Sequence, residues 1–171
     1  RSLDAAGIDY VIYNQVEPNP KIHNIQAVKA LYQANQADSL ITIGGGSAHD
    51  TGKGAGIIMT NGDDITKLAG IETLKNALPP LIAVNTTAGT GSELTRHCVI
   101  TNEDTHYKFV VASWRNMPLV SFNDPTLMLD VTKGLTAATG MDAFFQAIEP
   151  FVAVDHSPIT DSPCIQAIKL F

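Results

Sequence analysis

The sequence predicts an α/β fold: a parallel sheet covered by helices, a small antiparallel hairpin, and then a region made only of helices. Two observations carry this prediction. As far as residue 131, short apolar runs rich in β-branched residues alternate with segments of helical periodicity. Beyond residue 132 the strand-like runs stop, and alanine, threonine and other helix-compatible residues dominate.

The first part of the chain has the order strand, helix, strand. Residues 9–13 (DYVIY) form an apolar run typical of a strand, and residues 22–35 place Ile25 and Val28 at helical spacing. Residues 40–43 (LITI) then form a second strand. This order and spacing predict a right-handed βαβ unit and therefore a parallel sheet.

Further elements follow at similar spacing. A helix is expected over residues 48–59, and a short helical or irregular connection over residues 65–75. Strands are predicted at residues 81–84, 97–101, 108–112 and 120–122. The turn-forming residues between the second and third of these strands predict an antiparallel hairpin.

The change of composition near residues 130–133 predicts a domain boundary. We expect residues 1–131 to form the α/β domain and residues 132–171 to begin a helical one. Both ends of the sequence stop within a structural pattern, because the start resembles the tail of a helix and the end lies inside an apolar periodicity. A fragment of a longer protein is therefore expected.

Composition narrows the class of partner. The net charge of −6 and the absence of a dense Lys/Arg cluster argue against nucleic-acid binding, and no apolar stretch has the length of a membrane span. The two cysteines are far apart and lack CxxC spacing, which gives no sign of a disulfide framework or zinc knuckle and fits a reducing cytoplasm. We expect a cytoplasmic protein with a small-molecule partner.

An apolar run that ends in three glycines and a serine is the most informative local feature. Gly44–Gly46 precede Ser47 where the strand at 40–43 should pass into a helix. Glycines let backbone N–H groups approach an anion, and a helix N-terminus adds about +0.5 elementary charge. Two interpretations stay open: a phosphate cradle, or a tight turn in which Ser47 and Asp50 form a pair like a capping box.

Three more glycines, at positions 52, 54 and 56, lie inside the helix expected next. Each costs about 1 kcal/mol relative to alanine. Such a cost is reasonable where a helix lies close to other backbone or to a ligand, so these glycines favour the functional interpretation. The pattern is not GxGxxG, which points away from the ordinary dinucleotide fingerprint.

A second polar and glycine-containing stretch, residues 86–93 (TTAGTGSE), follows the strand predicted at 81–84. Its hydroxyl groups and glycines could wrap a phosphate or a ribose at the carboxyl end of that strand. The alternative is a polar loop that caps a helix starting near Glu93.

An aspartate in an otherwise apolar helix start, Asp142, is open to two interpretations. It is either a residue stabilised by the helix dipole or a metal ligand. The five histidines show neither HxxxH nor HExxH spacing, which excludes a zinc-protease site. Among the histidines, His49 is the candidate for a functional role, since it lies just past the glycine turn.

Three motifs in order, GGGSxxD, TTAGTGSE and TGMDA, give the chain its resemblance to the iron-containing (group III) alcohol dehydrogenases. The resemblance covers essentially the whole chain. Shorter stretches, such as AGIETL, TRHCVIT and SWRN, are most similar to members that act on 1,3-propanediol, with methanol-oxidising members nearby.

The resemblance implies that residues 1–131 belong to an NAD(P)-binding domain and that residues 132–171 begin an all-helical domain holding a divalent metal, with Fe(II) favoured over Zn. The positions that match the family's cofactor contacts are Gly45, Gly46 and Ser47 for the pyrophosphate, Thr86, Thr87, Thr90 and Ser92 for phosphate and sugar groups, Lys108 for the ribose, Leu127 for packing, and Asp50 at the rim of the nicotinamide pocket.

The metal positions depart from the family pattern. In the family the TGMDA aspartate, here Asp142, is followed four residues later by a histidine, and the two ligate the metal from one helix face. Position 146 is Gln146 in this chain, and a Gln amide oxygen is a weaker, neutral ligand. Pro150 should also kink or end this helix.

The expected activity is hydride transfer between NAD(P) and a short-chain alcohol or diol, such as 1,3-propanediol, or its aldehyde, in a homo-oligomer without nucleic-acid or membrane partners. Two alternatives stay open. The first is a nucleotide-binding remnant of this fold with a deficient metal site. The second is a zinc enzyme similar to glycerol dehydrogenase.

Overall fold

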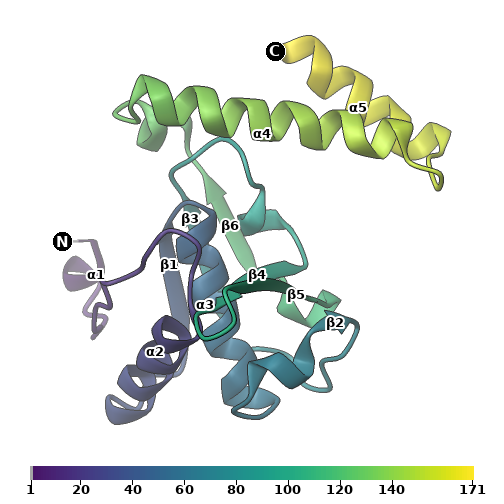
Figure 1. The fold of residues 1–171 in the computed structure, drawn as a ribbon. Helices are drawn as coiled ribbons and strands as arrows, with labels where there is room; N and C mark the ends of the chain where they lie inside the picture. Colours follow the sequence, from purple (N-terminus) through teal and green to yellow (C-terminus); the bar gives the residue numbers. More distant parts are fainter. Residues whose placement is uncertain (1) are drawn as a thin grey trace. The chain divides into compact units, whose positions relative to one another are not determined.

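The computed structural model describes residues 2–171 (Figure 1). Its α-helices are α1 (Ser2–Ala5), α2 (Ile22–Ala34), α3 (Gly46–Thr60), α4 (Lys133–Val152) and α5 (Pro158–Leu170). Its strands are β1 (Leu40–Gly44), β2 (Gly70–Ile71), β3 (Leu81–Asn85), β4 (His97–Asn102), β5 (Tyr107–Ala112) and β6 (Val120–Asn123). Short 3-10 helices are η1 (Ile65–Leu68), η2 (Ser92–Leu94), η3 (Trp114–Asn116) and η4 (Pro125–Met128).

The described residues divide into two compact units, one formed by residues 2–85 and 92–123 and the other by residues 86–91 and 124–171. The first unit contains a parallel sheet of order β1-β3-β6 and a second sheet of order β2-β5-β4. In the second sheet, β4 and β5 form the predicted antiparallel hairpin, and β2 pairs in parallel with β5. The α/β prediction with a parallel sheet and a hairpin is confirmed.

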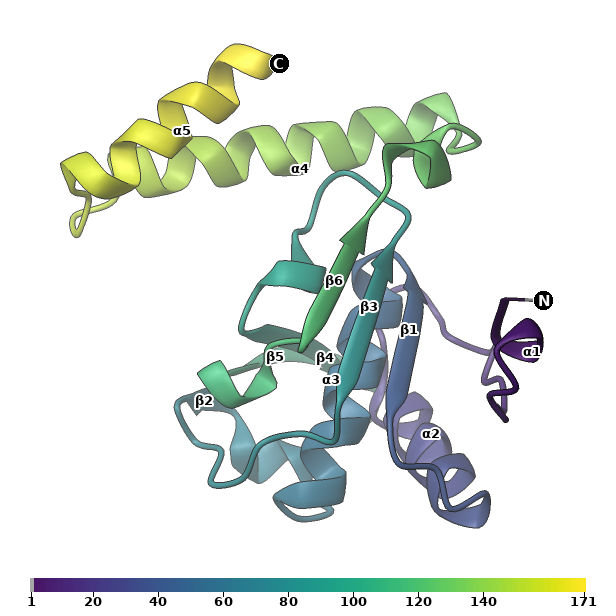
Figure 2. The ribbon, with the colours of Figure 1, turned by 180° about the vertical axis from the view of Figure 1, so that it is seen from behind.

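Helix α3 is the central element of the first unit. On one side it packs against the parallel sheet (Figure 2). Thr42, Ala83 and Asn85 of that sheet are buried. On its other side lie α2 and β4, which enclose a core that includes Ile25 and Ile100. Residues on both sides of α3 are therefore buried, and its side chains can reach both sheets.

The α3 glycines are explained by this packing. A Cβ on Gly52 would lie 2.2 Å from Thr42 Cγ2, and one on Gly54 would lie 2.5 Å from Ile25 Cδ1. A Cβ on Gly56 would lie 3.2 Å from the Leu78 side chain. The interpretation of these glycines as favouring a ligand site is therefore wrong, since the groups that approach them are protein side chains.

The strand predicted at residues 9–13 is not formed, so the predicted βαβ unit that begins there is wrong. Residues 8–17 have no regular secondary structure, and Ile12 is largely exposed. A strand needs a neighbour for its backbone N–H and C=O groups. Among residues 2–171, no strand pairs with this segment.

In the second unit, α4 and α5 contact each other. Phe144 and Phe171 meet edge to face, with 5.5 Å between ring centroids. Pro150 lies in the last turn of α4, which ends at Val152, as the proline predicted. No helix among residues 2–171 is long and apolar enough to cross a membrane. The division into domains 1–131 and 132–171 stays a prediction.

Candidate functional site

The glycine turn lies at the carboxyl edge of the parallel sheet. Gly44 ends β1 and is the register partner of Asn85, which ends β3. The glycine turn and the threonine-rich segment therefore leave the sheet from paired positions. In open α/β sheets this edge is where ligands bind.

Helix α3 begins with a backbone arrangement suited to an anion. Its N-cap is Gly45, which offers no side-chain cap to the first N–H groups. Gly44 has φ +147°, and a Cβ there would lie 2.8 Å from Ala48 Cβ, so only glycine fits. The geometry fits a phosphate at the helix N-terminus.

The capping interpretation of Ser47 and Asp50 is wrong. The helix starts at Gly46 rather than Ala48, so Ser47 lies within the first turn and cannot be the N-cap. Asp50 points elsewhere: its Oδ1 accepts a 2.7 Å hydrogen bond from Ser92 Oγ, and its Oδ2 accepts one of 3.1 Å from the N–H of Val99.

A residue that the sequence interpretation missed, Asn19, joins two of the predicted cofactor residues. Its N–H donates to Ser47 Oγ at 3.3 Å, and its Oδ1 accepts from Lys108 Nζ at 2.7 Å. Its φ of +57° is a left-handed conformation that Asn tolerates. The sequence signal for this residue is an Asn between two prolines, which by itself predicts only a turn or extended backbone.

Lys53 is another functional candidate without a sequence signal. Its side chain is fully buried, and its Nζ donates to the carbonyl oxygens of Thr95 and His97, each at 2.8 Å. Burial lowers the pKa of Lys53, and the charge of Asp50 opposes that shift. In Asp50 burial raises the pKa of the carboxyl, while the hydrogen bond from Ser92 and the charge of Lys53 lower it.

His49 is also fully buried, on the side of α3 that faces the sheet. Its Nδ1 lies 2.8 Å from Thr42 Oγ1. Burial, with a smaller effect of Lys53, lowers the pKa of His49 to about 4, so the ring is neutral at pH 7. The Asn85 side chain opposes this shift, although Nε2 has no partner in hydrogen-bond geometry among the described residues.

The threonine-rich segment is divided between the two compact units. Thr86–Gly91 belongs to the second unit, where a Cβ on Gly89 would lie 2.7 Å from Thr139 Cβ of α4. Ser92 and Glu93 belong to the first unit and are buried in η2. In place of the helix expected to start near Glu93, the chain makes only this single 3-10 turn and then enters β4.

The remaining predicted residues lie in the second unit. Leu127 is part of η4 and is partly exposed. On α4, Gln146 Nε2 donates a 3.0 Å hydrogen bond to Asp142 Oδ2, which places an amide nitrogen against the carboxylate. Among residues 2–171 there is no group of three or more His, Cys, Asp or Glu that could hold a metal ion. The described donors therefore do not fit a metal centre.

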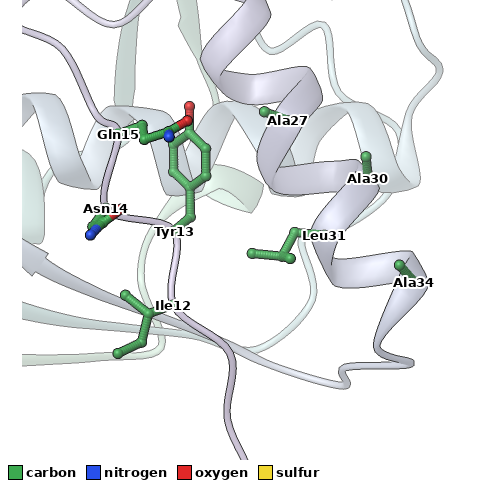
Figure 3. Close-up of a pocket in the computed structure, with 8 residues that line it drawn as sticks. All are labelled: Ile12, Tyr13, Asn14, Gln15, Ala27, Ala30, Leu31 and Ala34. Carbon is green, nitrogen blue, oxygen red and sulfur yellow. The ribbon is translucent and has the colours of Figure 1, made fainter.

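A groove of about 550 Å³ lies between residues 12–15 and α2. Figure 3 shows Tyr13 on one side and the small side chains of α2 on the other. The lining residues are Ile12, Tyr13, Asn14, Gln15, Ala27, Ala30, Leu31 and Ala34. None of the predicted cofactor or metal residues is among them.

Comparison with known proteins gives consistent matches. Residues 1–125 match the family described as iron-containing alcohol dehydrogenase. A 1,3-propanediol dehydrogenase of Klebsiella pneumoniae is 54% identical over 98% of this chain and 43% of its own length. An alcohol dehydrogenase structure from Oenococcus oeni shares 83% identity and a TM-score of 0.95, covering 99% of this chain and 44% of that one.

A more distant match is the structure of a protein in complex with a nicotinamide cofactor. Sulfoacetaldehyde reductase from Bifidobacterium kashiwanohense, in complex with NAD+, is 36% identical with a TM-score of 0.85, covering 99% of this chain and 47% of the other. The chain thus spans less than half the length of the relatives it matches.

Proposed function

Because the chain belongs to the iron-containing alcohol dehydrogenase family, we propose that it forms part of an NAD(P)-dependent enzyme that interconverts a short-chain alcohol or diol and its aldehyde. A diol such as 1,3-propanediol is the substrate we favour, since a relative with 54% identity is a 1,3-propanediol dehydrogenase. Within the first compact unit, cofactor binding is the role we propose for the glycine turn and Ser47 at the start of α3 and for Lys108 on β5.

The observation that carries the proposal is the start of α3. An uncapped helix N-terminus follows a glycine turn at the carboxyl edge of a parallel sheet, and Ser47 lies in its first turn. Lys108 lies within the same network through Asn19. Backbone N–H groups, a hydroxyl and an ammonium group are the donors that a pyrophosphate and a ribose require.

The proposed division of roles assigns phosphate binding to Gly45, Gly46 and Ser47, and ribose binding to Lys108. Thr86, Thr87 and Thr90 stay predictions as contacts to the phosphate and sugar groups, and Leu127 as a packing contact. Asp50 and Ser92 bond to each other and are buried, which favours a supporting role over the predicted cofactor contact.

When bound, the nicotinamide cofactor supplies the hydride acceptor or donor. The described residues then have to hold the cofactor still and keep its phosphate charge compensated. Fixed backbone donors achieve this without reorganisation during the reaction. No residue of the described chain is assigned as a general acid or base.

The family name implies iron, but Asp142 and Gln146 do not fit a metal site by themselves. The Gln146 amide nitrogen faces the Asp142 carboxylate, and an amide oxygen would be a neutral ligand. We therefore derive no step through a metal. This pair favours a second candidate function, a nucleotide-binding protein of the same fold that lacks dehydrogenase activity.

Steady-state oxidation of 1,3-propanediol by the intact protein, with NAD+ or NADP+ and with Fe2+ or Zn2+ added, tests the proposal. We expect turnover with at least one of the two cofactors. Glycerol and methanol, assayed in parallel, separate the glycerol dehydrogenase-like and methanol-oxidising alternatives. NADH binding without turnover of any alcohol would favour the second candidate, and neither binding nor turnover would refute both.

Two further expectations stay proposals. A cytoplasmic location fits the two cysteines, Cys98 and Cys164, which are both free thiols. Assembly of identical chains is also proposed, and sedimentation of the intact protein would test it.

A further inference from the structure

The start of α2 takes its cap from a distant part of the first compact unit. Glu103, in the turn between β4 and β5, accepts hydrogen bonds from the N–H groups of Ile22 and His23, at 3.0 and 3.1 Å. The N–H of Lys21 donates to Asn24 Oδ1 at 3.0 Å, and the N–H of Asn24 reaches the carbonyl oxygen of Lys21 at 3.1 Å. All four N–H groups that a helix start leaves without an intrahelical partner are therefore bonded.

The sequence gives α2 no suitable cap of its own. Its N-cap residue is Lys21. The ammonium group of a lysine only donates hydrogen bonds, whereas the first N–H groups of a helix need an acceptor. A carboxylate supplies that acceptor and also fits the positive end of the helix dipole. Because Glu103 provides this carboxylate, the start of α2 depends on the position of the turn between β4 and β5.

The same end of the hairpin holds the residues just before α2. The N–H of Thr101 donates to the carbonyl oxygen of Pro20 at 2.9 Å, and Lys108 Nζ donates to Asn19 Oδ1 at 2.7 Å. Thr101 and Lys108 are register partners in the hairpin. Together with Glu103, they fasten the entry to α2 to the hairpin. All of these contacts lie within the first compact unit.

The entry to α2 matters because it contains Asn19. The N–H of Asn19 donates to Ser47 Oγ, in the first turn of α3, at 3.3 Å. Its φ of +57° is a sparsely populated conformation, so the chain around it has to hold it in place. On its C-terminal side the hairpin does this, and Glu103 forms two of the hydrogen bonds. Without Glu103, the link that Asn19 makes between Ser47 and Lys108 would be set less precisely.

We propose that Glu103 is a positioning residue for cofactor binding: by capping α2 from the turn of the hairpin, it holds Asn19 against the start of α3. Glu103 touches no cofactor atom in this scheme. Its negative charge would repel the phosphates of a dinucleotide, so a charge effect and a positioning effect of Glu103 have opposite signs. The inference rests on the proposed function, because it concerns the binding of NAD(P).

The test compares Glu103→Ala with the unaltered intact protein by NADH fluorescence titration. We expect the Kd for NADH to rise about threefold to tenfold, at the level of one or two lost hydrogen bonds. The KM for the oxidised cofactor should rise more than kcat falls. A lower Kd in the variant would mean that Glu103 acts only through its charge. That result, or a Kd within twofold of the unaltered value, would overturn the inference.

Asp104→Ala is the matched control for charge. Asp104 is the next residue of the same turn and is exposed, and its hydrogen bond to Asn102 Oδ1 comes from the backbone N–H rather than from the carboxylate. The control therefore removes the same charge from the same turn and leaves the cap of α2 intact. We expect its Kd for NADH and its melting temperature to match those of the unaltered protein. Equal weakening of NADH binding by Asp104→Ala and Glu103→Ala would contradict the inference.

A double variant separates positioning from stability. Lys21→Ser gives α2 a local cap, because a serine hydroxyl accepts hydrogen bonds from helix N–H groups and position 21 already has the extended backbone of an N-cap. Added to Glu103→Ala, it should restore the melting temperature but not the Kd for NADH, since the link to the hairpin stays broken. It also covers the case in which Glu103→Ala alone does not fold. A restored Kd would show that Glu103 only stabilises α2, and the inference would be wrong. If the unaltered protein binds neither NADH nor NADPH, the proposed function itself fails.

Discussion

Lys108 Nζ donates a 2.7 Å hydrogen bond to Asn19 Oδ1, although the two residues are 89 positions apart in the chain. Asn19 also reaches Ser47 Oγ with its backbone N–H. A residue of an irregular turn therefore connects the hairpin strand β5 to the first turn of α3. This connection brings Lys108 and Ser47, to which the family resemblance gives ribose and pyrophosphate contacts, into one hydrogen-bonded group.

Asn19→Gly and Asn19→Ala separate the two contributions of this residue. Glycine keeps the left-handed backbone and loses the Oδ1 acceptor, whereas alanine also adds a conformational penalty of about 1 kcal/mol. We expect both variants to weaken NADH binding roughly threefold to tenfold, at the level of one lost hydrogen bond. Only alanine should lower the melting temperature clearly. Unchanged NADH binding by Asn19→Gly would mean that Asn19 does not position Lys108.

Gly52→Ala tests the close packing of α3 on β1. Alanine normally stabilises a helix by about 1 kcal/mol relative to glycine. Here the new Cβ would lie 2.2 Å from Thr42 Cγ2, so we expect a net loss of about 1–3 kcal/mol. Gly134→Ala in α4 is the control, since the added Cβ would have no atom within 4 Å other than its chain neighbours and the backbone of its own helix. Urea unfolding should give opposite signs for the two variants, and equal signs would contradict this packing.

The buried His49 should make the free energy of unfolding depend on pH in the mildly acidic range. Its folded pKa of about 4 lies below the ordinary value of 6.5, so the unfolded chain binds the extra proton first as the pH falls. The contribution of the neutral His49 to the free energy of unfolding is complete above pH 6.5. It is lost as the pH falls toward 4, and the total loss is about 3 kcal/mol.

His49→Gln should flatten the stability profile between pH 6.5 and 5, measured by urea unfolding at several pH values. This window lies above the ordinary pKa of Glu17, Glu72 and Glu103, whose pKa values are lowered, so their contribution to stability is lost only as the pH falls below about 4.5. Burial raises the pKa of Asp50, but this carboxyl group is present in both proteins and therefore cancels in the comparison. An equally steep profile in the variant would show that another group is responsible.

Gln146→His tests whether the residue at position 146 determines metal binding. Histidine would remove the amide that hydrogen-bonds Asp142 and place an imidazole one helical turn from the carboxylate. We expect the iron or zinc content of the purified intact protein, measured by elemental analysis, to rise relative to the unaltered protein. Gln146→Ala serves as the control, because it removes the same amide without adding a ligand. Equal metal content in all three proteins would exclude position 146 as a determinant of metal binding.

The sheet could be predicted from the sequence because its strands are short apolar runs bounded by glycine, proline and asparagine. Residues 40–43 and 81–84 lie within observed strands for this reason. Residues 9–13 have the same composition but no paired neighbour among the described residues, and composition alone cannot report pairing. Whether a segment forms a strand therefore depends on a pairing partner elsewhere in the chain as well as on its own residue pattern.

The candidate site could be predicted only where glycine and hydroxyl residues follow a strand. Lys53 had no signal, because a lysine in a helix is usually a solvated residue and only the fold shows the carbonyl groups around it. Asp50 gave a misleading signal, since its spacing from Ser47 matched a capping pair while its partners lie more than 40 positions away. Long-range hydrogen bonds decide these roles, and no local spacing encodes them.

Calorimetric titration of the intact protein with NADH, compared with Ser47→Glu, tests the central claim most directly. A carboxylate placed in the first turn of α3 would repel a pyrophosphate without disturbing the buried residues behind it. The proposed site predicts saturable binding to the unaltered protein and a Kd raised at least about tenfold in the variant, roughly 1.4 kcal/mol. Absence of binding by the unaltered protein to both NADH and NADPH, or equal affinity in the variant, would contradict it.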